Sequence, residues 1–137
     1  MARTVIYDRV ALIGLGLIAG SMGLRMRRDG LAGEIVGTAR SAKTRDMAVG
    51  LGLCDRVTDT AAEAVQDADL VVLCVPVGAM EDVAREIGPH LKPGATVSDV
   101  GSVKRAVAEA IGPHWPALNI PARNRASRSC STTVGAC

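Results

Sequence analysis

Short apolar runs alternate with mixed polar and apolar stretches over most of the chain. The clearest runs are Val10–Ile13 and Leu70–Val75, which end at Gly14 and Pro76. Runs of this length, bounded by glycine or proline, are typical of strands buried on both faces of a parallel sheet. The predicted strands cover residues 10–13, 34–38, 56–58, 70–75 and 95–99, and the predicted helices cover 17–28, 42–49, 61–65, 79–87 and 103–111.

Strands that alternate with helices at this spacing predict right-handed crossovers and a doubly wound parallel sheet of the α/β class. Ligands of such sheets bind at the carboxyl ends of the strands. The alternation stops near Gly112, so the predicted domain spans residues 1–112. Beyond Glu109 there is no acidic residue, and Arg123, Arg125 and Arg128 lie among serine, threonine and cysteine. We expect the tail, residues 113–137, to be disordered.

Composition excludes several classes of protein. Of 137 residues, 48% are hydrophobic and the net charge is only +2, so neither nucleic acid nor a membrane surface is an expected partner. No apolar run reaches the length of a membrane span and no cleavable leader is visible, so we expect a cytoplasmic protein. The four cysteines form no CxxC pair, no metal site is expected, and Cys74 is predicted to be a buried free thiol.

The first predicted strand runs into a glycine-rich loop that opens a helix. Gly14 permits a tight turn, Gly16 lets the backbone approach a pyrophosphate, and the small Ala19 allows close packing of helix on strand. The pyrophosphate would meet the N–H groups of Leu17 and Ile18 at the positive end of the helix dipole. The alternative is a purely structural turn. The strand before and the helix after favour a dinucleotide site.

The tip of the second predicted strand indicates which dinucleotide binds. Enzymes that use NAD carry an Asp or Glu there, which binds the ribose 2′-hydroxyl. This position is Ala39, followed by Arg40 and Ser41, with Lys43 and Arg45 nearby. A guanidinium suits a 2′-phosphate better than a diol. NADP is therefore the predicted cofactor and NAD the alternative. A simpler interpretation is that Arg40 only caps a solvated loop and binds no cofactor.

The segment Asp99–Lys104, Asp-Val-Gly-Ser-Val-Lys, closes the fifth predicted strand. Together with the segments at 14–18, 74–78 and 91–94, it resembles the prephenate/arogenate (cyclohexadienyl) dehydrogenases from about Arg9 to Gly112. The resemblance implies a Rossmann-like NAD(P)-binding domain with Val75 and Pro76 beside the cofactor. It also implies that Ser102 hydrogen-bonds the substrate hydroxyl and the catalytic histidine. By itself, Ser102 fits the N-cap of the following helix equally well.

The resemblance further implies an activity, the oxidative decarboxylation of prephenate or arogenate in tyrosine biosynthesis. Relatives act on a small-molecule substrate, and an intact member is expected to be a homodimer held by a C-terminal helical domain, which is absent from these 137 residues. The family's histidine lies in a His-Pro-x-Ala-Gly segment that has no counterpart here, because His90 and His114 do not match it. We therefore expect the chain as written to bind cofactor without turnover.

The tail suggests a hypothesis about its origin. Shifted by two nucleotides, the codons from Pro113 onward can spell PLAGTEHSGPQPGFPELFDNRWCL, which resembles the family's continuation beyond its catalytic histidine. A deletion near Gly112 that removed the histidine segment and shifted the frame would explain this. The nucleotide sequence of the gene tests the hypothesis, since codons unable to spell that string would exclude it.

Two rival functions fit the same loop. One is the cofactor domain of another two-domain reductase, such as a β-hydroxyacid dehydrogenase, against which the Asp-Val-Gly-Ser-Val-Lys segment argues. The other is a non-catalytic domain that senses NAD(P). Such a domain needs only Gly14, Gly16 and Ala19, and it requires no histidine.

Overall fold

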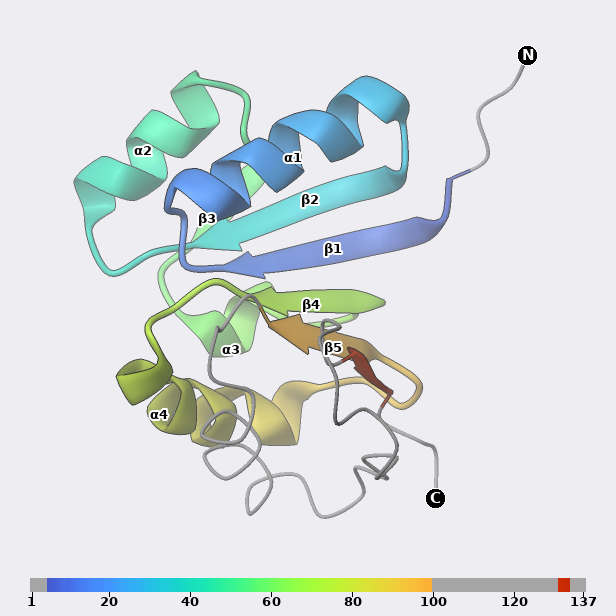
Figure 1. Cartoon of the computed structure of the whole chain (residues 1–137), viewed down its shortest axis with the longest axis vertical. Helices are drawn as coiled ribbons and strands as arrows, with labels where there is room; N and C mark the ends of the chain where they lie inside the picture. The colour runs from blue at the N-terminus through green and yellow to red at the C-terminus, as the bar shows by residue number, and fades with distance from the viewer. Residues whose placement is uncertain (1–4, 100–130, 134–137) are drawn as a thin grey trace.

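One sheet of six strands, in the order β3-β2-β1-β4-β5-β6, forms the centre of the molecule (Figure 1). The first five strands are parallel, which confirms the predicted doubly wound α/β fold. The strand order reverses between β1 and β4. The connections that follow these two strands therefore run in opposite directions and leave a crevice at the strands' carboxyl ends. The computed structural model describes residues 5–99 and 131–133, with strands β1 (Tyr7–Ile13), β2 (Ala32–Thr38), β3 (Arg56–Thr58), β4 (Leu70–Leu73), β5 (Thr96–Asp99) and β6 (Ser131–Thr133).

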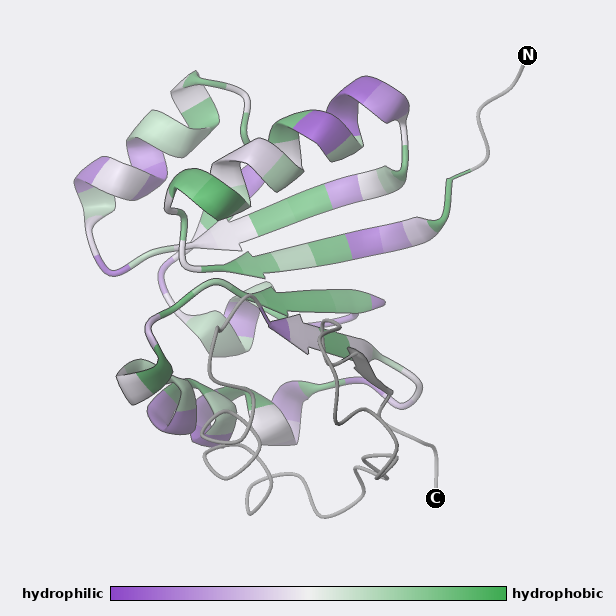
Figure 2. Cartoon of the chain, viewed as in Figure 1, coloured by the Kyte–Doolittle hydropathy of each residue, from purple (hydrophilic) through white to green (hydrophobic). Residues whose placement is uncertain are grey.

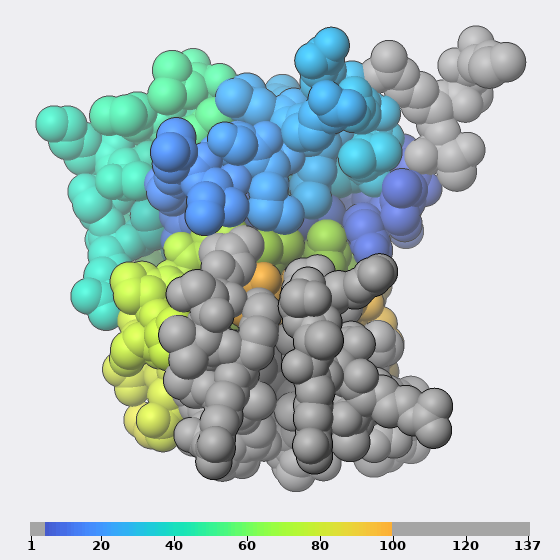
Figure 3. All heavy atoms as spheres, in the orientation of Figure 1, coloured from blue at the N-terminus to red at the C-terminus, as the bar shows by residue number. Residues whose placement is uncertain are grey.

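Helices cover both faces of the sheet (Figure 1). The helices are α1 (Leu17–Asp29), α2 (Ala42–Gly50), α3 (Ala61–Ala64) and α4 (Val77–Ile87), the last continuing into the 3₁₀ turn η1 (Gly88–His90). α1 and α2 form one continuous surface over one face, and α3 and α4 cover the other (Figures 1 and 3). Each face has its own cluster of buried aliphatic side chains, so the sheet is buried on both sides.

The two long strands, β1 and β2, are apolar mainly toward their carboxyl ends (Figure 2). β1 and β2 share one burial pattern, in which the last four residues are buried and the first three are not. β1 therefore begins at Tyr7, earlier than the predicted Val10, because Tyr7 and Arg9 pair through the backbone with β2. The hydrophobic pattern of a sequence cannot reveal polar residues that belong to a strand only through their backbone hydrogen bonds.

The boundaries around β4 also differ from those predicted. Cys74 donates its N–H to the Ile13 carbonyl at 2.7 Å, but the chain then turns, and the strand ends at Leu73 instead of Val75. α4 begins at Val77, directly after Pro76, whose φ of −56° suits the start of a helix. The connection between β4 and α4 therefore keeps three residues, as predicted, but it lies two residues earlier, at Cys74–Pro76, and these residues line the pocket at the sheet's carboxyl edge.

β6 departs from the sequence-based prediction, which placed no regular structure beyond residue 112. Its three residues pair antiparallel with β5. Without such a partner β5 would present an open edge, whose backbone groups accept any extended segment. The predicted helix at 103–111 and the other residues of the tail lie outside the described residues. Within the described part of the chain, no helix is long and apolar enough to cross a membrane.

A carboxylate ties three neighbouring strands together near their amino ends. Glu34 on β2 accepts from Arg9 Nε on β1 at 2.6 Å and from Arg56 Nε on β3 at 2.7 Å. The hydrogen bond from Arg56, with that from Arg9, lowers the pKa of Glu34 below its ordinary value. The ionised carboxylate therefore contributes stability above the ordinary glutamate pKa, and that contribution is lost as the pH falls through the lowered one.

Glu34→Gln is accordingly expected to lower the free energy of unfolding by about 1 kcal/mol at pH 7, because two partly exposed ion pairs are removed. At pH 3 the difference between the two proteins should shrink, because this pH lies below the ordinary glutamate pKa, where the unfolded chain already binds the proton. Urea titrations of both proteins from pH 7 to pH 3 measure this. A difference that stays constant over this range would contradict the assignment.

Candidate dinucleotide-binding site

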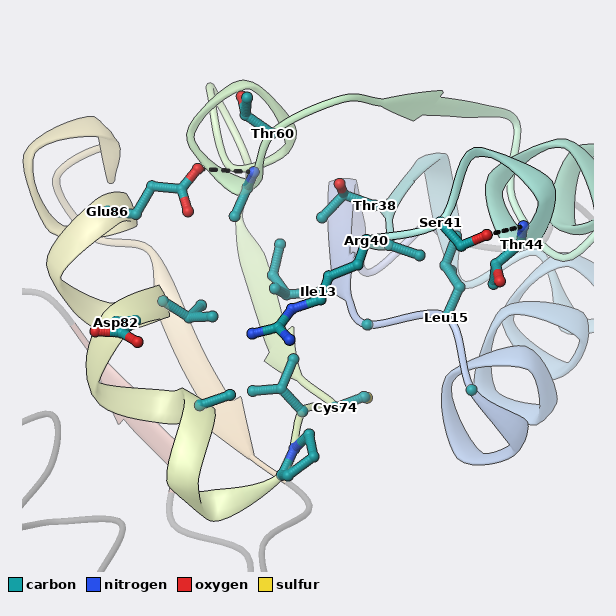
Figure 4. A pocket seen from close by; sticks show the side chains of 18 of the residues that line it. Ile13, Leu15, Thr38, Arg40, Ser41, Thr44, Thr60, Cys74, Asp82 and Glu86 are labelled. Atoms are coloured by element: carbon teal, nitrogen blue, oxygen red, sulfur yellow. Dashed lines mark hydrogen bonds between the residues drawn. The ribbon is translucent and has the colours of Figure 1, made fainter.

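A pocket of about 590 Å³ opens at the carboxyl edge of the sheet, where the order of β1 and β4 reverses (Figure 4). Its volume lies within the range typical of cofactor and small-molecule pockets. Four loops line it, one after each of β1, β2, β3 and β4. Of the residues predicted to bind cofactor, the pocket brings together Gly14, Gly16, Arg40, Ser41, Val75 and Pro76.

Gly14 is the turn that ends β1. Its φ of +94° is a conformation that other residues rarely adopt. A Cβ atom at this position would also lie 2.6 Å from the carbonyl oxygen of Cys74. Both features require glycine. The absence of a side chain at Gly14 allows the loop after β1 to lie close to the loop after β4, and these two loops border the crevice.

Gly16 plays a different part from Gly14. It is the N-cap residue of the 13-residue helix α1, and no side chain caps the helix there. A Cβ atom added to Gly16 would meet nothing within 4 Å. The space before the helix N-terminus is therefore open, and the first turn of α1 holds no acidic residue. An anion placed there would meet backbone N–H groups and the positive end of the helix dipole.

The other three residues of the predicted loop do not line the pocket. Ala19 is completely buried against the sheet, as close packing of helix on strand requires. The side chains of Leu17 and Ile18 are exposed, by 88% and 53% respectively. At the start of α1, these two residues can therefore serve an anion only through their backbone N–H groups.

The loop after β2 carries the pocket's cation. Figure 4 shows the Arg40 side chain directed into the pocket from this loop, between the ends of β2 and β4. Among residues 5–99, no ion pair to Arg40 is found. Ser41 is the N-cap of α2, and its Oγ accepts from the Thr44 N–H at 3.5 Å. Ala39, at the strand tip, offers no carboxylate to a ribose diol.

Sequence reasoning missed four other polar residues that line the pocket, Thr44, Asp59, Thr60 and Glu86. Glu86, on α4, accepts from the N–H groups of Ala61 and Ala62 at 3.1 and 3.3 Å and so joins α4 to the start of α3 (Figure 4). Thr60 could have been found, because it follows a predicted strand and caps a predicted helix. Glu86 has no comparable local signal.

Cys74 is placed differently from the sequence-based prediction. It lies just past β4, is only partly buried and lines the pocket, whereas a fully buried position was expected. Burial nevertheless raises the pKa of its thiol to about 11, so the group is neutral at physiological pH. In the described residues no cluster of three or more His, Cys, Asp or Glu could hold a metal ion. Ser102, the predicted substrate contact, lies outside the described residues.

A parallel doubly wound sheet, with a glycine turn after β1 and an open helix N-terminus at its switch point, defines a dinucleotide-binding domain. The family model for the nucleotide-binding domain of prephenate dehydrogenase matches residues 22–123. The chain belongs to the prephenate dehydrogenase family. The match begins after the glycine loop and extends past residue 112, the predicted end of the domain.

Relatives and solved structures agree with this assignment. The cyclohexadienyl dehydrogenase of Zymomonas mobilis is 41% identical over 112 residues, which are 81% of this chain and 38% of that protein. Synechocystis arogenate dehydrogenase superposes with a TM-score of 0.72 at 33% identity, covering 80% of this chain and 38% of the other. Prephenate dehydrogenase from A. aeolicus, in complex with hydroxyphenyl propionate and NAD+, gives 0.67 at 26%, covering 90% and 44%. The chain thus spans less than half the length of these relatives.

Proposed function

We propose that this chain is the cofactor domain of an NADP-preferring dehydrogenase that oxidatively decarboxylates prephenate or arogenate. The observation that carries the proposal is the pocket at the β1–β4 switch point. Its floor is the glycine turn and the open N-terminus of α1, which suit a pyrophosphate. The Arg40 guanidinium enters from the loop after β2, and the tip of this strand is where the adenosine ribose binds in this class of fold (Figure 4).

The preference for NADP rests on Ala39 and Arg40. An acidic residue at the position of Ala39 would accept from a ribose diol and repel a phosphate, and none is present. Arg40 lines the pocket, and a guanidinium pairs with phosphate through charge-assisted hydrogen bonds. The hydroxyls of Ser41 and Thr44 border the same side of the pocket and offer further donors (Figure 4).

The chemistry proposed for the whole enzyme divides between cofactor and protein. When bound, the nicotinamide supplies the acceptor for a hydride. The protein's part is to orient the cofactor through Gly16 and Arg40 and to hold the substrate hydroxyl, a role we propose for Ser102. We also propose that the intact enzyme is a homodimer and that its substrate is either prephenate or arogenate.

Calorimetric titration of the 137-residue chain with NADP and with NAD tests the cofactor assignment. We expect NADP to bind at least about tenfold more tightly than NAD, because one charge-assisted pair contributes about 1.5–3 kcal/mol. NAD binding as tight as NADP binding would refute the preference. Failure of both to bind would refute the site itself and favour a structural role for the loop.

A further inference from the structure

A second arginine, which does not line the pocket, binds the backbone of the loop that carries Arg40. Arg45, on the first turns of α2, donates from Nη1 to the Ala39 carbonyl at 2.6 Å and to the Arg40 carbonyl at 3.3 Å. Its Nη2 pairs with Asp59 Oδ1 at 3.2 Å. One guanidinium therefore joins the loop after β2 to the loop after β3.

The two arginines differ in their surroundings. The side chain of Arg45 is 16% exposed, and Arg45 does not line the pocket. Both of its terminal nitrogens already contact the protein, Nη1 through two backbone carbonyls and Nη2 through a carboxylate. Arg40 lines the pocket, and no ion pair to it is found in residues 5–99. Arg45 thus has the character of a support, and Arg40 that of a ligand-binding group.

The ion pair with Asp59 acts on the loop more than on the charge of the pocket. Asp59 lines the pocket, and its negative charge would oppose a phosphate bound beside Arg40. The Asp59 side chain is 85% exposed, so solvent screens both that charge and its pairing with Arg45. The main effect of the contact is therefore to hold the loop.

We propose that Arg45 is a positioning residue for recognition of a 2′-phosphate on adenosine. It holds the backbone at Ala39 and Arg40 so that the Arg40 guanidinium points into the pocket, and it acts through Arg40 and not by touching the phosphate. This inference rests on the proposed function, since it assigns a support to the same phosphate site.

The test uses two probes that differ only in the group of interest, adenosine 2′,5′-bisphosphate and 5′-AMP. The ratio of their affinities for the 137-residue chain measures recognition of the 2′-phosphate. Arg45→Gln is expected to lower that ratio roughly 3- to 10-fold, the effect of losing about one hydrogen bond's worth of ordering, with 5′-AMP binding nearly unchanged. Arg40→Ala should lower it by more.

The double variant Arg40→Ala/Arg45→Gln separates positioning from direct contact. If Arg45 acts through Arg40, the double variant is no worse than Arg40→Ala alone; additive losses would mean that Arg45 binds phosphate itself and would overturn the inference. Lys43→Gln, which removes an exposed charge two residues away on α2, is the control and should leave the ratio unchanged. An equal loss in this control would reduce the effect to net charge and also overturn the inference.

Arg45→Lys covers the case in which Arg45→Gln fails to fold. Lysine keeps the charge but cannot present two nitrogens to the loop carbonyls and Asp59 together, so the ratio should again fall. Full selectivity in Arg45→Lys would overturn the inference. If Arg40→Ala itself leaves the ratio unchanged, the proposed NADP preference fails instead, which is a distinguishable result.

Discussion

Gly16→Val is expected to abolish measurable dinucleotide binding while the domain stays folded. The valine side chain would occupy the open space before α1, which is where a pyrophosphate would approach the helix N–H groups. We expect affinity for NADP to fall at least about 100-fold, because the anion loses its contact with the helix terminus. Calorimetric titration measures the affinity, and urea denaturation measures the stability.

Two other glycines supply the comparison. Gly50→Ala adds a methyl group into open space at the end of α2, away from the pocket, and should change neither binding nor stability much. Gly14→Val should instead destabilise the fold, because its positive φ and the nearby Cys74 carbonyl exclude a side chain. Unchanged NADP affinity in Gly16→Val would show that this loop is only structural.

The paired change Ala39→Asp with Arg40→Ala is expected to reverse cofactor preference from NADP toward NAD. It removes the guanidinium that would pair with a 2′-phosphate and installs a carboxylate that accepts from the ribose diol. Loss of one charge-assisted pair lowers NADP affinity roughly 10- to 100-fold, and repulsion by the new carboxylate adds to this. NAD affinity should rise or stay constant. Titration with both cofactors gives the ratio.

Lys43→Ala is a matched control for the loss of positive charge, since Lys43 is exposed and does not line the pocket. It should leave the ratio of the two affinities within about twofold, because exposed charges that make no contact are screened by salt. If the paired change at 39 and 40 leaves the ratio of NADP to NAD affinity unaltered, Arg40 does not bind the 2′-phosphate and is only a solvated residue of the loop.

Much of the fold was predictable because each signal is local. Apolar runs and their bounding glycines located five parallel strands, and Asp29-Gly30 marked the end of α1, where the N–H of Gly30 bonds to the Arg27 carbonyl. The turn at Gly14 and the small Ala19 followed from their spacing after β1. The polar start of β1 and the pairing of β6 could not be found in this way, because both depend on backbone partners distant in sequence.

The sequence by itself determined the parallel sheet, the glycine loop and the absence of an acid at Ala39, since these depend on residue type and short spacing. Only the tertiary structure decided which residues face one another across the crevice. Glu86 reaches α3 from α4, and Arg45 reaches Asp59 from α2. Such contacts join elements that the chain's crossovers bring together at one edge of the sheet, and long side chains on exposed helix faces give no sign of their partners in advance.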